Sequence, residues 1–239
     1  MWARYYAGMQ AVILAAGRGT RMGALTDTLP KPMLKVAGKS LIEHKLDVLP
    51  DEVDEVILII GYQGAVIRAA FGDSYEGKRI TYIEQETLDG TAGAVWKARP
   101  ALRDRFIVMM GDDLYCRADI LACIDTPDWS VVYEDMPDSA AGGRLVTDAS
   151  GIITGIREGT HAGTRGFINT NLMLLDERFF DHPPVPKISG SGEFGLPQTA
   201  LMISQEDGIP FKAIRTAFWF QITAPEDLSA AEAALARRS

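Results

Sequence analysis

Short apolar runs that suit buried β-strands alternate along the first half of the chain with segments that suit helices. The runs cover residues 10–14, 56–60, 80–83, 106–110 and 130–133. Several of them, such as VILII at 56–60, are apolar at every position, which is typical of a strand covered by helices on both faces. Helices are expected at 41–49, 63–71 and 91–98, and the capping-box sequence Ser40-Leu-Ile-Glu43 marks the start of the first. This alternation predicts a doubly wound, Rossmann-like α/β fold with a mostly parallel sheet.

The pattern changes after about residue 133, where strands no longer alternate with helices. Residues 144–147 and 152–157 flank a polar turn and predict a β-hairpin. A further strand is expected at 169–175, and helices are expected at 196–205 and from 223 to the end of the chain. Residues 182–192 contain three prolines and predict a loop with the composition of a mobile segment. We therefore expect a single domain, residues 1–239, whose sheet is mixed in its second half.

Composition and charge exclude several classes of partner. The 239 residues carry a net charge of −8, which argues against binding to nucleic acid or to an anionic membrane surface. The two cysteines, Cys116 and Cys123, fit no metal-ligand spacing and indicate a reducing compartment. No apolar run is long enough to span a bilayer, and residues 1–8, read as an extension ahead of Met9, are too short for a signal peptide. We expect a cytoplasmic protein.

The first apolar run ends in a glycine-rich turn, within the stretch AVILAAGRGTRM at residues 11–22. Gly17, Gly19 and Gly23 give the spacing GxGxxxG. A dinucleotide-binding fingerprint would need glycine at Met22, and a Walker loop would need a Gly-Lys-Ser/Thr sequence that is absent. Glycines nevertheless let backbone N–H groups approach an anion closely, so the turn predicts a phosphate-binding loop.

Cationic side chains follow the same turn. Arg18 and Arg21 add guanidinium groups, which match phosphate oxygens bidentately. Lys31 lies between Pro30 and Pro32, which restrict the backbone on either side of it. The combination indicates a site for a triphosphate or another phosphorylated ligand.

The pairing of LAAGRGTRM with LPKPM resembles the signature of the sugar-1-phosphate nucleotidylyltransferases, also called nucleoside-diphosphate-sugar pyrophosphorylases. The similarity continues through VAGKSLIE and IGY and ends with PEDL, so it covers almost the whole chain. Members transfer a nucleotidyl group from a nucleoside triphosphate to a sugar 1-phosphate and release pyrophosphate. The resemblance implies this reaction, small-molecule substrates and a GT-A-like fold whose acceptor-binding half is about residues 134–220. Whether the chain forms a homo-oligomer stays open.

The resemblance also implies roles for individual residues. The expected nucleotide-binding set is Leu14, Ala15, Ala16, Gly17, Gly19, Thr20, Arg21, Gln85, Gly90 and Thr91. The expected catalytic set is Arg21, Lys31 and Asp112, with Asp112 as a Mg²⁺ ligand. The expected acceptor-binding set is Gly111, Glu158, Asn169 and Lys187. The Gln85 amide offers both a donor and an acceptor to a base, which favours UTP or dTTP, although the GTAG sequence also occurs in guanylyltransferases.

Three positions depart from the family pattern. The lysine that often follows the hairpin glutamate is missing, and Arg157, Arg165 or Lys187 are the candidates to replace it. Asn171 stands where glycine is usual. Gln221 stands where many members have a second metal-binding aspartate, and its amide oxygen can bind Mg²⁺ only without charge.

These departures leave alternatives to an active sugar-1-phosphate nucleotidylyltransferase. One is a CTP-dependent cytidylyltransferase that acts on a phosphoalcohol such as phosphocholine. Another is a nucleotide-binding homologue with impaired catalysis, as Gln221 and the missing lysine suggest. A third is a GT-A-like glycosyltransferase, which the pairing of GTRM with PKPM argues against. Pyrophosphate release separates the transferases from the others.

Overall fold

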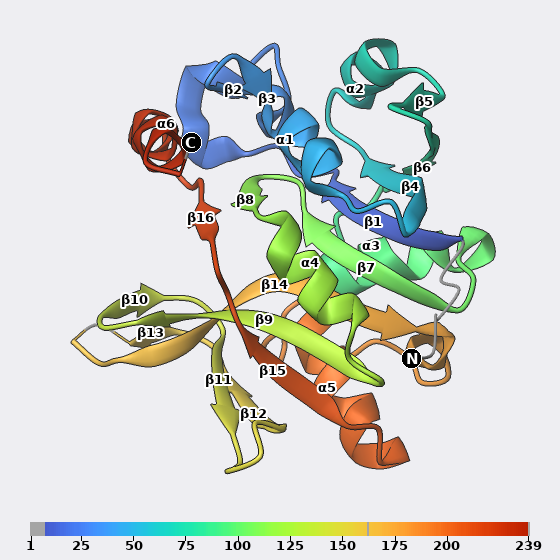
Figure 1. Ribbon diagram of the computed structural model, residues 1–239, viewed down its shortest axis with the longest axis vertical. Helices are drawn as coiled ribbons and strands as arrows, with labels where there is room; N and C mark the ends of the chain where they lie inside the picture. Colours follow the sequence, from blue (N-terminus) through green and yellow to red (C-terminus); the bar gives the residue numbers. More distant parts are fainter. Residues whose placement is uncertain (1–7, 162, 239) are drawn as a thin grey trace.

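A ten-stranded mixed sheet runs through the molecule, which a computed structural model describes for residues 8–161 and 163–238 (Figure 1). The sheet comprises β1 (Met9–Ala15), β4 (Val53–Ile60), β5 (Ser74–Tyr75), β6 (Lys78–Glu84), β7 (Arg105–Met110), β9 (Trp129–Met136), β11 (Arg144–Thr147), β12 (Ile153–Arg157), β14 (Gly166–Asp176) and β15 (Phe211–Arg215). Its order is β12-β11-β14-β7-β1-β4-β6-β5, and β9 pairs with both β14 and β15. The expected extension lies outside the described residues except for Gly8.

The parallel part of the sheet contains a topological switch point. Strand β1 is parallel to β4 on one side and to β7 on the other, and β4 is parallel to β6. Strand β14 then runs antiparallel to β7, as do β11 and β12 to each other. The prediction of a mixed doubly wound sheet is confirmed. In such sheets ligands bind at the carboxyl ends of the strands beside the switch point, which here are the ends of β1 and β7.

Helices cover both faces of the sheet. They are α1 (Leu41–Val48), α2 (Gly64–Phe71), α3 (Thr91–Ala98), α4 (Arg117–Ile124), α5 (Leu196–Asp207) and α6 (Glu226–Ala236), with 3₁₀ turns η1 (Thr20–Thr26), η2 (Lys31–Met33), η3 (Arg99–Ala101) and η4 (Glu177–Phe180). The capping box of α1 is present, because Ser40 Oγ accepts from the Glu43 N–H and the Glu43 carboxylate accepts from the Ser40 N–H. Helix α4 was not expected from the sequence, and its N-cap residue, Cys116, makes no side-chain capping bond.

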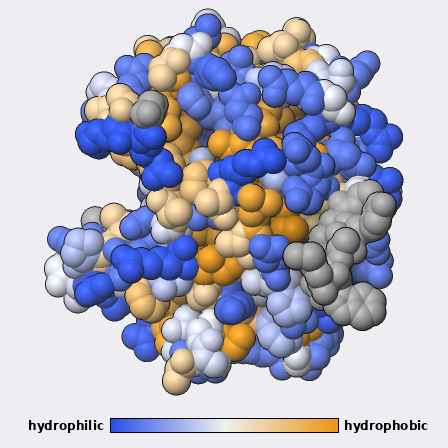
Figure 2. Space-filling view, viewed as in Figure 1, coloured by the Kyte–Doolittle hydropathy of each residue, from blue (hydrophilic) through white to orange (hydrophobic). Residues whose placement is uncertain are grey.

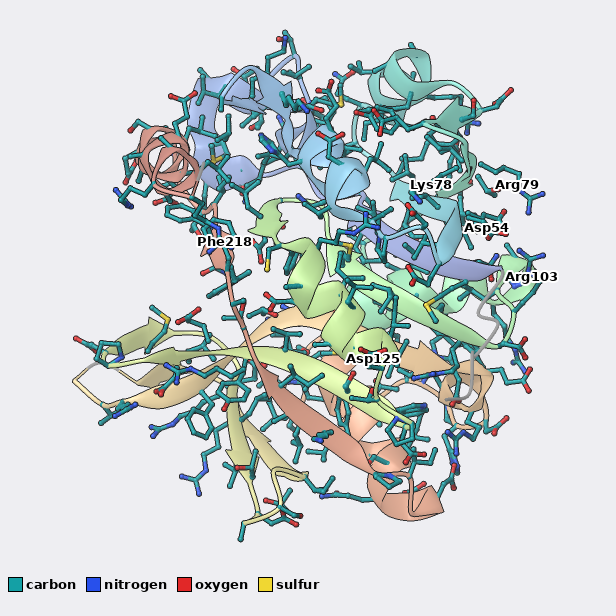
Figure 3. The ribbon with its side chains drawn as sticks, in the orientation of Figure 1. Asp54, Lys78, Arg79, Arg103, Asp125 and Phe218 are labelled. Atoms are coloured by element: carbon teal, nitrogen blue, oxygen red, sulfur yellow. The ribbon has the colours of Figure 1, made fainter. Side chains whose placement is uncertain are left out.

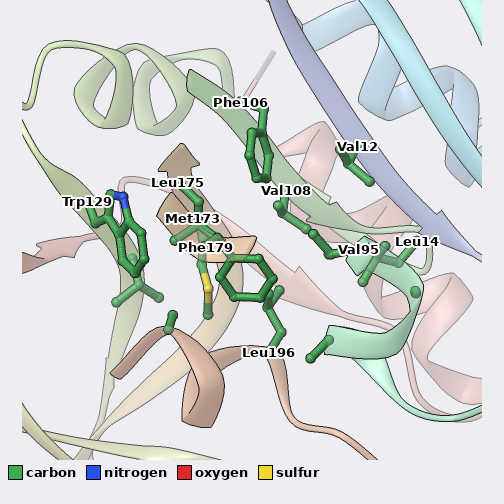
Figure 4. Close-up of a cluster of buried hydrophobic side chains, with 14 of the residues drawn as sticks. Val12, Leu14, Val95, Phe106, Val108, Trp129, Met173, Leu175, Phe179 and Leu196 are labelled. Atoms are coloured by element: carbon green, nitrogen blue, oxygen red, sulfur yellow. The ribbon is translucent and has the colours of Figure 1, made fainter. Parts of the chain in front are cut away.

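Two apolar layers explain why the strands are apolar at every position. Val12 and Leu14 of β1 pack into one layer with α3 and α5, which Figure 4 shows in close-up. Ala11 and Ile13 point to the opposite layer, with α1, α2 and α4. Successive side chains of a strand alternate between faces, so a strand buried on both sides needs apolar residues throughout.

The C-terminal segment returns to the carboxyl end of the sheet. Strand β16 (Trp219–Gln221) pairs antiparallel with β8 (Asp113–Tyr115), and α6 packs against β2 (Lys35–Val36), which pairs with β3 (Lys39–Ser40). Figure 1 shows α6 beside these N-terminal strands, and β10 (Ser139–Ala141) and β13 (Thr160–His161) projecting away below them. Within the described ranges no helix is long and apolar enough to cross a membrane. The fold thus brings Gln221 next to the end of β7.

Candidate active site

Three adjoining cavities follow the carboxyl ends of β1 and β7. The loop cavity, of about 250 Å³, is lined by Leu14, Ala15, Gly17, Gly19, Thr20, Arg21, Lys31, Pro32, Met110, Asp112 and Thr223. The central cavity, of about 240 Å³, shares Arg21, Met110, Asp112 and Thr223 with it and extends to Asp113, Glu158, Asn169, Asn171, Lys187, Gln198 and Gln221. The helix cavity, of about 220 Å³, is lined in part by Ala16, Gln85, Gly90, Thr91 and Lys187. Most of the expected site residues therefore meet in one connected region.

Two glycines of the glycine-rich loop are required for different physical reasons. Gly19 has φ of 70°, and a Cβ there would lie 2.6 Å from the Cβ of Lys31, so packing requires glycine. A Cβ at Gly17 would meet no protein atom within 4 Å, although the residue lines both the loop and helix cavities. Packing does not explain Gly17, and its position favours close approach of a ligand to the backbone.

The two arginines of the loop have different surroundings. The Arg18 guanidinium lies over the Tyr62 ring, 5.2 Å from its centroid. Arg21 is exposed, lines the loop and central cavities, and forms no hydrogen bond or ion pair within the described part of the chain. Arg21 is therefore the arginine available to an anionic ligand.

Lys31 joins three parts of the chain that are distant in sequence. Its ammonium group lies 2.6 Å from Asp112 Oδ2 and also donates to the carbonyl oxygen of Ile222. The side chain is 7% exposed, whereas that of Asp112 is 30% exposed. The lysine expected on a phosphate is thus paired with the carboxylate expected on the metal, and it holds that carboxylate at the cavity.

A buried polar group beneath Asp112 was missed by the sequence analysis. Lys45 is fully buried and donates to the carbonyl oxygens of Leu41, at 3.0 Å, and Asp113. Burial lowers the pKa of Lys45 to about 8, although the negative charges of Asp113 and Asp112 act to raise it. Lysine on the apolar face of α1, beside Leu46, was the signal in the sequence that could have revealed it.

Asp113, the first residue of β8, is buried next to Asp112 and lines the central cavity with it. Its Oδ2 accepts from the Trp219 indole at 2.9 Å, across the β8–β16 pair. Burial, together with the charge of Asp112, raises the pKa of Asp113 to about 7. The bond to Trp219 ties the residue that follows Asp112 to β16, the strand that carries Gln221.

The candidate metal ligands comprise one carboxylate and one amide. Asp112 and Gln221 both line the central cavity, and Gln221 is exposed. Across residues 8–161 and 163–238, no three His, Cys, Asp or Glu side chains cluster in a way that could hold a metal ion. Mg²⁺ fits this donor set only with water and substrate phosphates as its remaining ligands, which is its common mode of binding.

Gln85 is buried at the helix cavity with a fixed orientation. Its Nε2 donates to Asp89 Oδ1 at 2.8 Å and to the Gly90 carbonyl oxygen at 3.2 Å. Both partners only accept hydrogen bonds, so the amide cannot be reversed. The Oε1 atom accepts no bond within the described part of the chain, so in this arrangement the amide leaves its acceptor open to a base while its donors are already used.

The acceptor-side residues meet in the central cavity, with one exception. Glu158, Asn169 and Lys187 line it, whereas Gly111 lies against the Leu14 carbonyl oxygen, 2.6 Å from where a Cβ would be. Asn171 has φ of 58°, a conformation that favours glycine or asparagine, which explains its identity.

Of the three candidates for the missing lysine, only Lys187 lines these cavities. Arg165 instead forms a bidentate pair with Asp135, at 2.6 and 2.8 Å. Arg157 is exposed and does not line them. Among these three candidates, the structure therefore favours Lys187 as the replacement for the missing lysine.

A larger hollow of about 710 Å³ adjoins the central cavity through Arg21, Ile168, Gln221 and Thr223. Its remaining wall is mostly acidic and aromatic, with one methionine and one proline: Glu134, Asp135, Met136, Pro137, Asp138, Trp219, Phe220 and Asp227. Figure 2 shows it as the notch between the part that carries α6 and the part that carries β10 and β13. Burial raises the pKa of Glu134, although the positive charge of Arg215 acts to lower it.

Comparison with known proteins gives consistent results. Residues 10–128 match the family model described as nucleotidyl transferase. The chain is 29% identical over 239 residues to the UTP--glucose-1-phosphate uridylyltransferase AglF of Haloferax volcanii, covering 94% of this chain and 95% of the relative. It is 29% identical over 221 residues to the bifunctional protein GlmU of Methanocaldococcus jannaschii, covering 92% of this chain and 52% of the relative. The chain thus spans about half the length of that relative.

Solved structures are similar over almost the whole chain. The crystal structure of HddC from Yersinia pseudotuberculosis superposes with a TM-score of 0.71 at 26% identity, covering 95% of this chain and 99% of that one. A putative glucose-1-phosphate thymidylyltransferase from Bacillus anthracis gives a TM-score of 0.81 at 22% identity, covering 97% of this chain and 96% of that one. The second likeness supports the fold alone.

Proposed function

The chain belongs to the nucleotidyl transferase family, and from this premise we propose that it transfers a nucleotidyl group from a nucleoside triphosphate to a sugar 1-phosphate. The products are a nucleotide sugar and pyrophosphate. One observation carries the proposal: connected cavities bring the glycine-rich loop and Asp112 together with the acceptor-side residues Glu158 and Asn169.

The mechanism requires positioning and charge neutralisation rather than a nucleophile from the protein. An oxygen of the acceptor's phosphate attacks the α-phosphorus, and the bond to pyrophosphate breaks on the opposite side. Backbone N–H groups beside Gly17 would bind the triphosphate, and Arg21 would neutralise charge that develops on it. Lys31 would keep Asp112 in place. Asp112 and Gln221 would hold Mg²⁺, which supplies positive charge to the phosphate oxygens when bound.

The orientation of the Gln85 side-chain amide favours particular nucleoside triphosphates. Its free Oε1 can accept a hydrogen bond, but its Nε2 is occupied by Asp89 and Gly90. Uracil and thymine present a donor at N3, and guanine presents one at N1. Cytosine N3 and adenine N1 are acceptors instead, although the exocyclic amino groups of both bases also donate. An acceptor at Gln85 therefore suits the N3–H of UTP or dTTP, and the choice among the remaining nucleotides rests on the assay below.

The acidic hollow favours a second candidate acceptor, a phosphoalcohol with a cationic group such as phosphocholine. Carboxylates together with the Trp219 and Phe220 rings are the groups that attract ammonium ions. The hollow is continuous with the central cavity through Arg21 and Gln221, so a long acceptor can reach both.

The test is pyrophosphate release with Mg²⁺ from UTP, dTTP, GTP, CTP or ATP, each paired with sugar 1-phosphates and with phosphoalcohols. We expect release from UTP or dTTP with a sugar 1-phosphate. Release with phosphocholine would support the second candidate. No release from any pair, with nucleotide still bound, would contradict both and leave the impaired nucleotide-binding homologue.

A further inference from the structure

The carboxylate of Glu158 is held by a glutamine from another part of the chain. Gln198, in the first turn of α5, donates its Nε2–H to Glu158 Oε1 at 2.7 Å, and both residues line the central cavity. Gly143 closes the opposite side, because a Cβ there would lie 2.9 Å from the same oxygen. One oxygen of Glu158 is thus restrained, and Oε2 has no partner within the described part of the chain.

Gln198 holds this orientation at a cost in stability. A carboxylate only accepts hydrogen bonds, so the glutamine must present Nε2 to Glu158, which sends Oε1 the other way. That Oε1 is buried without a hydrogen-bond partner, and a Cβ at Gly195 would lie 1.9 Å from it. Burying an unpaired acceptor destabilises a fold, and an apolar side chain would avoid it. The amide therefore points to a role other than packing.

The start of α5 is also fixed to the segment proposed to bind the base. The Leu196 N–H donates to Thr91 Oγ1 at 3.0 Å. The Phe194 N–H donates to the Asp89 carbonyl oxygen at 2.7 Å, and the Ala92 N–H donates to the Phe194 carbonyl oxygen at 3.0 Å. Gln198 consequently places Glu158 relative to the nucleotide end of the site.

We propose that Gln198 is a positioning residue, which aims Glu158 Oε2 at a hydroxyl of the acceptor and thereby sets affinity for the acceptor. The proposal rests on the proposed function. Gln198 acts through Glu158, so its loss affects the acceptor and leaves the nucleoside triphosphate unaffected.

The first test is Gln198→Leu, which removes the amide and also the unpaired Oε1. We expect the KM for the sugar 1-phosphate to rise about tenfold or more, with the KM for the nucleotide within about twofold of the wild-type value. Gln205→Leu is the matched control on the same helix, because its amide donates to the Thr154 carbonyl oxygen outside the cavities. Equal changes in both KM values, or no change, would overturn the proposal.

Gln198→Glu gives a readout that a packing role does not predict. It places a second carboxyl group against Glu158, and two such groups share a proton. We expect the acceptor KM of this variant to improve as pH falls from 8 to 6 relative to wild type. If the ratio of the variant's acceptor KM to the wild-type value does not change between pH 8 and pH 6, the positioning role is contradicted.

Wild-type turnover separates the two proposals. If the wild-type chain releases no pyrophosphate from any pair, the proposed function fails. Calorimetric titration of sugar 1-phosphate into wild type and Gln198→Leu then still decides the role of Gln198. Weaker binding by the variant supports it, and equal affinities overturn it.

Discussion

Arg18 and Arg21 lie on either side of Gly19, yet the fold places them in different environments. Arg18 stacks on Tyr62, whereas Arg21 faces the cavities. We expect Arg21→Ala to lower kcat/KM for pyrophosphate release by about 10²-fold or more, because a charged group beside developing phosphate charge is lost. Arg18→Ala is the matched control, and it should change kcat/KM for pyrophosphate release only a few-fold. Similar losses in both variants would contradict this assignment.

A substitution at Gln221 tests whether this residue contacts the metal ion. Gln221→Asp adds a carboxylate to the wall that Asp112 shares. Because Mg²⁺ binds carboxylate oxygens more strongly than amide oxygens, the concentration needed for half-maximal activity should fall severalfold. Measuring pyrophosphate release at increasing Mg²⁺ concentrations gives this half-maximal concentration. An unchanged midpoint would mean that Gln221 does not contact the metal.

Helix α1 carries Lys45 to its place beneath the site, and its start depends on a local motif. Ser40→Ala removes the side-chain bond to the Glu43 N–H, and we expect the free energy of unfolding to fall by about 1 kcal/mol. Chemical denaturation measures the change. Ser229→Ala, in α6, removes a hydroxyl that is not at an N-cap and should cost less. Equal losses would deny a special role to the capping box.

At the scale of the whole molecule, a charged cluster closes the amino ends of the strands, opposite the cavities. Glu55 of β4 accepts from Gln10 at 2.7 Å and Thr81 at 2.9 Å and pairs with Arg79 and Arg103 at 2.9 and 2.8 Å. Figure 3 shows these two arginines at that edge. Burial raises the pKa of Glu55, but the hydrogen bonds and arginines outweigh it, so the pKa lies below its usual value.

A depressed carboxyl pKa stabilises the fold above the usual pKa, and this stability is lost as pH falls through the depressed value. Glu55→Gln should therefore lower the free energy of unfolding by about 1–3 kcal/mol at pH 7, and the difference should shrink below about pH 4. Denaturation at a series of pH values measures it, with the exposed Glu86→Gln as control. A difference that does not depend on pH would contradict an ionised Glu55.

The sequence by itself determined the strands that are apolar on both faces, most of the helices and the phosphate-binding turn. These features depend on local periodicity, glycine conformation and capping, which neighbouring residues decide. The family resemblance followed from motifs of the same kind and is confirmed. Helix α4, without a capping bond, and β15, which pairs with β9 from far along the chain, had no such local signal.

Only the tertiary structure decided how the candidate site is arranged. Lys31 meets Asp112 across 81 residues, and Ile222 across 191, so no local pattern could pair them. The orientation of the Gln85 amide and the hold of Gln198 on Glu158 depend on which acceptors surround each amide. Side-chain hydrogen bonds of this kind form only after the sheet has brought distant segments together, which is why the chain's residues indicated the chemistry but its fold determined the geometry.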